Sequence, residues 1–189
     1  MPTSRRTRGF TLWFTGLPAS GKTTISNATL KELILHGIDE PELLDGDVIR
    51  RHISSGLGFS RQDRNANILR IGWVAQLLTK HGVPNLVAAI SPYRDTRKQV
   101  REMVEAVGGH GSFVEIYVAC SVEECIHRDP KGLYAKAIRG EIKGFTGIDD
   151  PYEPPENPEL ALNTLQLDVA TSVHLILDYL KAHTLIERP

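Results

Sequence analysis

Eight consecutive residues, from Gly16 to Thr23, have the types and spacing needed to hold the phosphates of a nucleotide. They are Gly16, Leu17, Pro18, Ala19, Ser20, Gly21, Lys22 and Thr23, which match the pattern G-x-x-x-x-G-K-[ST] without substitution. In such a loop the glycines let backbone N–H groups turn towards the phosphates, Lys22 supplies a positive charge, and the Thr23 hydroxyl can bind Mg2+. An apolar run before the loop and a helical pattern after it supply the strand–loop–helix context that the motif requires.

Two carboxylates follow the next short apolar run, in Asp45-Gly46-Asp47. If that run is a strand, they lie at its carboxyl end, where open α/β sheets place groups that contact ligands. Asp47 could accept the proton of an acceptor hydroxyl or bind a Mg2+-bound water, with Asp45 as its partner. The same tripeptide is also a common turn, so both interpretations stay open. Arg50, three residues after Asp47, could face the same pocket and bind an anionic acceptor.

A second polar pair and two aromatic residues are further candidates for a binding site. Arg64 and Asn67 are three residues apart near the start of an expected helix, where a solvated pair is an equal alternative. Phe59 and Phe145 are isolated aromatic residues close to glycines. Each could fill a small satellite core, or the two could enclose a planar base.

The elements that must position these residues alternate between strands and helices. Apolar runs predict strands, and apolar positions at helical spacing predict helices. The expected strands are 10–15, 43–44, 86–90, 113–119 and 160–163. The expected helices are 24–36, a long helix capped by Ser60 that ends at Lys80, 95–107, a short helix capped by Ser121, and a final helix with core positions from Val169 to Leu180. In the first helix the expected core face comprises Ile25, Ala28, Leu33 and Ile34. This alternation predicts an α/β fold in three layers, a central parallel sheet with helices on both faces, of the P-loop nucleotide kinase type.

The chain of 189 residues is long enough for one domain, which we expect at 9–189, after an arginine-containing flexible tail at 1–8. Between about 128 and 158, glycine and proline are frequent and apolar periodicity is weak. A long irregular stretch in a compact domain is usually functional or disordered, and we interpret this one as a mobile lid over the nucleotide site.

Composition and missing motifs narrow the function. The net charge of -1 argues against a general nucleic-acid or membrane-surface binder, and no signal peptide or membrane span is expected. Two cysteines, Cys120 and Cys125, make no metal or redox motif and fit a reduced, cytoplasmic protein. The guanine-reading motif Asn-Lys-x-Asp is absent, and strand 113–119 ends without a Walker B acid. A kinase for a small substrate therefore fits better than a GTPase or a motor.

Six segments, taken in order, resemble the adenylyl sulfate (APS) kinases. The resemblance extends from about Gly9 to Leu180, and the segments are 16–24, 44–47, 57–60 with 63–65, 90–94, 129–134, and 145–148 followed by 151–153. It implies ATP-dependent phosphorylation of the 3'-hydroxyl of adenylyl sulfate, giving 3'-phosphoadenylyl sulfate and ADP, in sulfate activation.

The resemblance also implies roles for individual residues. ATP is assigned to the loop from Gly16 to Thr24, with Arg128 near its adenine or making a charge contact from the lid. Catalysis is assigned to Asp47, Asp45, Lys22 and Ser91, and Mg2+ to Thr23 and Asp47. Adenylyl sulfate is assigned to Arg50, Phe59, Arg64, Asn67, Ile90, Lys131, Leu133 and Phe145.

Two positions in this pattern need comment. Ser91 matches a serine that descriptions of the family mark as a phosphoserine intermediate, although in-line transfer between two bound nucleotides needs no covalent relay. A serine before a proline is also an ordinary residue at the end of a strand. Val48 stands where many relatives have asparagine, which removes one polar group beside Asp47.

The resemblance implies a homodimer, and a kinase module of this type can be fused to or associated with ATP sulfurylase. Two other functions are alternatives. The chain could be a noncatalytic, regulatory nucleotide-binding domain, or a P-loop kinase for another small anionic metabolite. Intact Lys22, Thr23, Asp47 and Arg64 argue against the first, and the pair Phe59 and Phe145 favours a nucleotide acceptor over a sugar acid.

Overall fold

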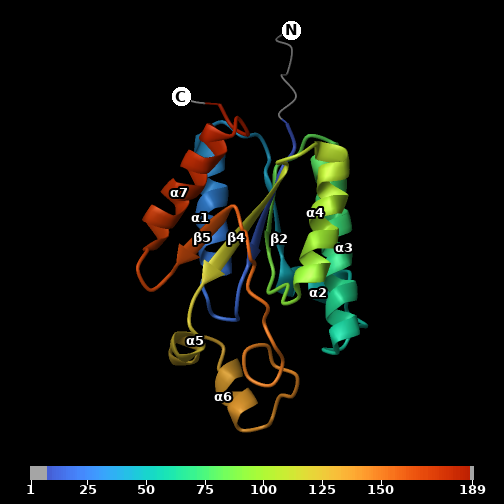
Figure 1. The fold of residues 1–189 in the computed structure, drawn as a ribbon, viewed down its shortest axis with the longest axis vertical. Coiled ribbons are helices and arrows are strands. Elements are labelled where there is room, and N and C mark those ends of the chain that lie inside the picture. Colours follow the sequence, from blue (N-terminus) through green and yellow to red (C-terminus); the bar gives the residue numbers. More distant parts are fainter. Residues whose placement is uncertain (1–7, 188–189) are drawn as a thin grey trace.

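The computed structural model describes residues 8–187, which form a parallel five-stranded sheet between two layers of helices (Figure 1). The strand order is β2-β3-β1-β4-β5. The strands are β1 Thr11–Thr15, β2 Glu42–Asp45, β3 Asn85–Ala88, β4 Phe113–Ala119 and β5 Leu160–Asn163. In the central part of the sheet Leu12 of β1 lies in register with Leu86 of β3 and with Val114 of β4. The predicted α/β fold is confirmed.

Helices α1 and α7 cover one face of the sheet, and α3 and α4 cover the other (Figure 1). The helices are α1 Lys22–Leu35, α2 Gly46–His52, α3 Arg61–Lys80, α4 Arg94–Gly108, α5 Val122–Arg128, α6 Leu133–Ile138 and α7 Val169–Ala182. The short helices α5 and α6 lie beyond the end of the sheet rather than on a face. They belong to the segment that lies over the carboxyl ends of the strands.

The two faces of β1 enter two different hydrophobic cores, because side chains alternate along a strand. Leu12 and Phe14 pack with α1 and α7, and Trp13 packs with α3 and α4. All five residues of β1 are buried, as expected for a central strand of a parallel sheet. Burial on both faces fixes the end of β1, and therefore fixes the position of the phosphate loop that follows it.

Loops from the carboxyl ends of β1, β2 and β3 bring distant residues to one edge of the sheet. The phosphate loop before Lys22 follows β1, Asp45 and Asp47 lie at the end of β2, and Ile90 and Ser91 follow β3. In a parallel sheet these ends lie together, so the topology assembles the residues that the sequence separates.

Some boundaries differ from the prediction. Ile34 is 54% exposed and does not belong to the core face of α1, because that face follows Ile25 and Leu33. The segment expected to be irregular contains the helix α6. Strand β3 ends at Ala88 rather than at residue 90, and the chain turns at Ser91, whose φ is 42°.

Residues 1–7 of the expected tail lie outside the described residues. Arg8 is exposed and donates hydrogen bonds to the carbonyl oxygens of Gly108 and His110. Among residues 8–187, no helix has the length and apolar character needed to cross a membrane.

Candidate active site

The backbone of the phosphate loop needs glycine at two positions. Gly16 has φ 153° and Gly21 has φ 105°, which are conformations that other residues rarely adopt. A Cβ atom on Gly16 would lie 2.5 Å from the carbonyl oxygen of Val118 on the neighbouring strand β4. The loop therefore packs closely against the sheet before it turns into α1, whose first backbone N–H groups have no partner within the helix.

The ammonium group of Lys22 is folded back onto the loop. It donates hydrogen bonds to the carbonyl oxygens of Gly16 (2.9 Å) and Leu17 (2.6 Å). Burial lowers the pKa of Lys22 to about 8, although the nearby Asp47 and Asp45 carboxylates oppose this shift. The loop thus holds a buried cation beside two acidic side chains.

Asp45 and Asp47 have different local roles. One oxygen of Asp45 caps α2 by accepting hydrogen bonds from the backbone N–H groups of Asp47 (2.9 Å) and Val48 (3.3 Å). Its other oxygen lies 3.3 Å from the Thr23 hydroxyl. The Asp47 carboxylate is exposed and forms an ion pair with Lys131. Lys131 belongs to residues 128–158, the stretch expected to act as a lid, which we call the lid segment. The Asp45 side chain is therefore fixed by its hydrogen bonds to the start of α2, whereas the Asp47 side chain faces the open site.

A cavity of about 490 Å³ lies over the phosphate loop and unites most of the predicted site residues. Those among its lining residues are Pro18, Ala19, Gly21, Lys22, Thr23, Thr24, Asp45, Asp47, Arg50, Phe59, Arg64, Asn67, Ile90, Ser91, Lys131, Leu133 and Phe145. Gly16, Leu17, Ser20, Arg128 and Val48 do not line it. Residues brought by β1, β2, β3, α3 and the lid segment therefore line one open cavity.

Arginine side chains and aromatic rings form one side of this cavity. The guanidinium group of Arg50 lies 4.2 Å from the ring centroid of Phe59 and donates to the carbonyl oxygens of Leu57 (3.1 Å) and Gly58. Arg64 donates to the carbonyl oxygen of Phe59 (2.9 Å) and lies 5.7 Å from the same ring. Phe59 itself is 59% exposed, so its ring is available to another planar group.

Arg64 and Asn67 are both buried, which excludes a purely solvated pair. The side-chain oxygen of Asn67 has no hydrogen-bond partner among the described residues. Because an unpaired buried carbonyl oxygen is costly, its position on the cavity wall favours a donor from a ligand. Phe145 packs edge to face against Tyr134, with ring centroids 4.9 Å apart.

Arg128 is placed outside the cavity, at the end of α5. It donates to Glu124 (2.8 Å) and to the hydroxyl and carbonyl oxygens of Thr164 (both 3.0 Å). These contacts join α5 to the loop after β5. The guanidinium plane thus has a fixed position beside the carboxyl end of the sheet.

The hydroxyl of Ser91 is engaged within the protein. It accepts a hydrogen bond from Trp13 Nε1 (3.0 Å) and donates to the carbonyl oxygen of Ala89 (3.4 Å). Ser91 is 1% exposed, and its positive φ is held by a hydrogen bond from Arg97 to its carbonyl oxygen (2.7 Å). A strained backbone of this kind is maintained only where surrounding contacts fix it.

Several residues at the site were not singled out from the sequence. Tyr134 is buried and donates from its hydroxyl to the carbonyl oxygen of Pro18 in the phosphate loop (3.1 Å). Tyr93, Arg97 and Asp150 connect the lid segment to α4 and to α3. Tyr134 lies in a segment that had been noted, but no spacing rule in the sequence pairs Asp150 with Arg64.

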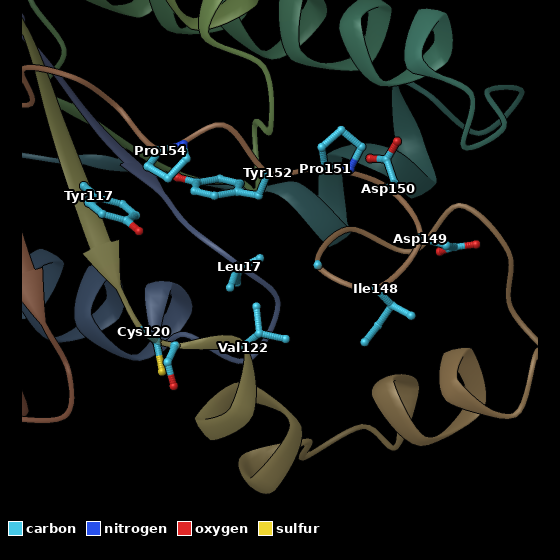
Figure 2. A pocket seen from close by; sticks show the side chains of 12 residues that line it. Leu17, Tyr117, Cys120, Val122, Ile148, Asp149, Asp150, Pro151, Tyr152 and Pro154 are labelled. Carbon is cyan, nitrogen blue, oxygen red and sulfur yellow. The ribbon is translucent and has the colours of Figure 1, made fainter.

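A second cavity, of about 540 Å³, lies between the phosphate loop, the end of β4 and the lid segment (Figure 2). Leu17 forms its floor on the side of the phosphate loop. The rings of Tyr117 and Tyr152 stack with centroids 6.1 Å apart, and Tyr152 shares a hydrogen bond with Thr15 (2.9 Å). Residues 142–146 line the first cavity, and residues 147–152 together with Pro154 line the second. The lid segment therefore passes between the two.

Comparison with known proteins identifies the family of this chain. The family model described as "Adenylylsulphate kinase" matches residues 8–163. The adenylyl-sulfate kinase of Synechococcus sp. (strain JA-3-3Ab) is 49% identical over 93% of this chain and 96% of its own length. That of Microcystis aeruginosa is 53% identical over 86% of this chain and 88% of its own.

Solved structures give the same result. The Mycobacterium tuberculosis APS kinase in complex with AMPPNP and APS superposes with a TM-score of 0.86 at 42% identity, covering 92% of this chain and 98% of that one. A gluconokinase from Sinorhizobium meliloti, at 16% identity and a TM-score of 0.62, shares the fold alone. Because the family model matches residues 8–163 and the relatives are about 50% identical, the chain belongs to the adenylyl-sulfate kinase family.

Proposed function

We propose that this protein is an active adenylyl-sulfate kinase, which transfers the γ-phosphoryl group of ATP to the 3'-hydroxyl of adenylyl sulfate. The observation that carries the proposal is the single cavity in which the phosphate loop, the Asp47 carboxylate and the Phe59–Phe145 pair meet. A donor nucleotide and an acceptor nucleotide each find suitable groups there, with a carboxylate between them.

The donor half of the site binds the ATP phosphates. The loop from Gly16 to Thr24 supplies backbone N–H groups and the start of α1. Lys22 moves from the carbonyl oxygens that it now contacts to the β- and γ-phosphates. We assign to Arg128, which donates to Thr164, a contact with the adenine or a charge contact from the lid.

The Thr23 hydroxyl and the Asp45 and Asp47 carboxylates would hold Mg2+. The Thr23 hydroxyl and Asp45 are 3.3 Å apart, and hard oxygen ligands of this kind suit Mg2+. No group of three or more acidic, histidine or cysteine side chains that could hold a metal occurs within residues 8–187, which fits a cation completed by substrate phosphates and water. When bound, Mg2+ would neutralise charge that develops on the phosphates.

The acceptor half of the site binds adenylyl sulfate. Phe59 and Phe145 enclose its adenine, and the side-chain oxygen of Asn67 accepts a hydrogen bond from it. Arg50 and Arg64 supply positive charge for its anionic groups, beside the hydrogen bonds that both guanidinium groups make to backbone carbonyl oxygens. Further contacts come from Ile90, Lys131 and Leu133, which line the same cavity.

Transfer requires the acceptor hydroxyl in line with the bond that breaks. Asp47 accepts the hydroxyl proton, the 3'-oxygen forms a bond to the γ-phosphorus, and the bond from that phosphorus to the ADP oxygen breaks. Lys131, which now pairs with Asp47, would move to a phosphate when the lid segment closes. For Ser91, whose hydroxyl is bonded to Trp13 and Ala89, we propose a positioning role, with phosphorylation as the alternative that a substitution tests.

The remaining proposals concern the assembled protein. We propose a cytoplasmic homodimer, as the family resemblance implies. A hexameric APS kinase from Thiobacillus denitrificans matches 98% of this chain but only 31% of that chain, so larger assemblies occur around such modules. Association with ATP sulfurylase is part of the proposal.

The function is tested by measuring ADP release with four acceptor conditions, namely adenylyl sulfate, adenosine monophosphate, gluconate and no acceptor. We expect turnover with adenylyl sulfate alone, because only this acceptor matches both the aromatic pair and the arginine pair. Turnover with gluconate instead would support a kinase for another anionic metabolite. ATP binding without turnover of any acceptor would contradict the enzymatic proposal and support a regulatory nucleotide-binding domain.

The low pKa of Lys22 makes nucleotide binding dependent on pH. Below about pH 8 the buried lysine is charged, and above it the lysine in the free enzyme loses its proton. ATP phosphates stabilise the charged form, so binding above this pH takes up a proton. The ATP dissociation constant is then expected to rise by up to about tenfold per pH unit. Calorimetry at about pH 8.5, in buffers of different ionisation enthalpy, measures the proton uptake.

The matched control for Lys22 is Lys22→Arg, because a guanidinium stays protonated throughout this range. Cys125 does not interfere, since burial raises the pKa of its thiol to about 12. Equal proton uptake by the wild type and Lys22→Arg would show that another group titrates.

A further inference from the structure

We propose that Asp150 is a positioning residue for the acceptor nucleotide, which it serves by fixing Arg64 between the two aromatic segments of the site. The inference rests on the proposed function, because it assigns the Phe59–Phe145 slot to the base of the acceptor. Asp150 does not line the acceptor cavity, so it acts through other side chains.

The Asp150 carboxylate gathers three side chains from different parts of the chain. It accepts the hydroxyl hydrogen of Tyr93, with distances of 3.0 and 3.1 Å to its two oxygens. It also lies 3.6 Å from Nε of Arg64 and 3.5 Å from the hydroxyl of Thr146. Tyr93 precedes α4, Arg64 belongs to α3, and Thr146 follows the aromatic residue of the lid segment. The carboxylate therefore ties the lid segment to both helices on this side of the sheet.

Arg64 in turn connects the two segments that carry the aromatic rings. Its Nε donates to the carbonyl oxygen of Phe59, and its Nη2 donates to the carbonyl oxygen of Gly144, next to Phe145. One guanidinium group thus spans both sides of the expected base slot. The guanidinium group therefore links the backbone on the two sides of the slot.

The charge of Arg64 makes this arrangement depend on Asp150. The side chain of Arg64 is only 9% exposed, and that of Asp150 is 17% exposed. Asp150 is the acidic side chain within ion-pair distance of Arg64 among residues 8–187. A buried guanidinium that loses its counter-charge becomes costly, and it relaxes towards solvent or towards other acceptors.

The backbone directly after Asp150 is anchored to the sheet and to the turn before α4. The following residues are attached to the sheet: Tyr152 is bonded to Thr15, and Glu153 N donates to the carbonyl oxygen of Pro92 (2.8 Å). The neighbouring Asp149 has a separate task, since it accepts hydrogen bonds from the backbone N–H groups of Gly144 (2.7 Å) and Phe145 (2.5 Å). Figure 2 shows the two carboxylates leaving the loop in different directions. Asp149 therefore fixes the turn at 144–145 within the lid segment, whereas Asp150 connects this segment to Tyr93 and Arg64.

The test is a kinetic comparison of Asp150→Asn with the wild type. We expect KM for adenylyl sulfate to rise about tenfold, with KM for ATP and kcat within about threefold of the wild-type values, because the acceptor slot is disturbed and the phosphate loop is not. Asp150→Glu should recover part of the loss, because it keeps the charge. Glu156→Gln is the matched control, since Glu156 pairs with Arg94 on the surface of the same segment.

Tyr93→Phe is a second variant that keeps the ion pair and removes one hydrogen bond, so it should raise the same KM by a smaller factor. An unchanged KM for adenylyl sulfate in a folded Asp150→Asn protein would overturn the inference. So would equal losses for both substrates together with a lowered melting temperature, which indicate a structural role alone. Absence of turnover in the wild type would instead remove the proposed function, and this inference with it.

Discussion

Asp47→Asn should lower kcat by about a hundredfold to ten-thousandfold, the range associated with loss of a general base. The substitution keeps the size of the side chain and removes its ability to take the proton of the 3'-hydroxyl. Lys22, Thr23 and Asp45 stay in place and the asparagine amide keeps an oxygen for Mg2+, so the affinity for ATP should fall far less than kcat does. Single-turnover measurement of ADP formation at saturating substrates, with calorimetric titration of ATP, separates the two effects.

Lys131→Met is the control that distinguishes proton transfer from ion pairing. Asp47 contacts Lys131 in this structure, so loss of activity in Asp47→Asn could in principle come from release of the lid segment. If Asp47 acts as the base, Lys131→Met should reduce kcat far less than Asp47→Asn does. Equal losses in the two variants would assign the effect to the ion pair.

Ser91→Ala tests the role of the Ser91 hydroxyl. A covalent relay through Ser91 predicts loss of turnover in this variant, whereas a positioning role predicts that turnover is retained.

Most of the order of the elements could be read from the sequence, because the strands and the longer helices carry local signals; the short helix α2 was not predicted. The strands 113–119 and 160–163 were predicted with the bounds that the structure gives. Ser60 and Ser121 were recognised as caps, and each accepts the hydrogen bond expected of a cap. The helix α6 was missed because it is short and begins after Gly132, without a side-chain cap or an apolar stripe.

The residues of the site were foreseen where a motif names them. The phosphate loop and the carboxylates after β2 follow from spacing, and the acceptor residues follow from resemblance to a family. Contacts between distant polar residues could not be foreseen, because nothing in the spacing of Arg64 and Asp150 shows that the lid segment folds back onto α3. The contact of Arg128 with Thr164 could not be foreseen for the same reason, since Arg128 ends α5 and Thr164 follows β5.

Arg97 is the most completely buried example of such a contact. It is 3% exposed, and its guanidinium donates to Glu115 on β4, to the carbonyl oxygen of Ser91 and to that of Glu153, each at 2.7 Å. One side chain therefore joins the sheet, the turn after β3 and the end of the lid segment. The sequence held two signals that were not combined: an arginine in line with the apolar stripe of α4 at Val100, and a single acid within the apolar strand β4.

Arg97→Met is expected to lower the free energy of unfolding by about 3–5 kcal/mol, the cost of breaking a buried ion pair by removing one partner. The substitution leaves the Glu115 carboxylate facing a low-dielectric interior, with Arg101, at 3.6 Å, as the remaining cation within ion-pair distance among residues 8–187. It also removes the guanidinium donor from the carbonyl oxygens of Ser91 and Glu153. Urea denaturation followed by circular dichroism measures the loss, and the slope of the transition shows whether unfolding stays two-state.

The double variant Arg97→Met/Glu115→Met decides whether the loss comes from the unpaired charge or from the lost contacts of the guanidinium. Removing the acid as well should recover most of the stability if the orphaned carboxylate is the main cost, because apolar replacements of buried pairs are often neutral. Arg139→Met, which breaks an exposed pair with Glu141, should leave the transition unchanged. No recovery in the double variant would locate the energy in the bonds to Ser91 and Glu153. In that case Arg97 would act as the connection that holds the end of the lid segment to the turn beside the active site.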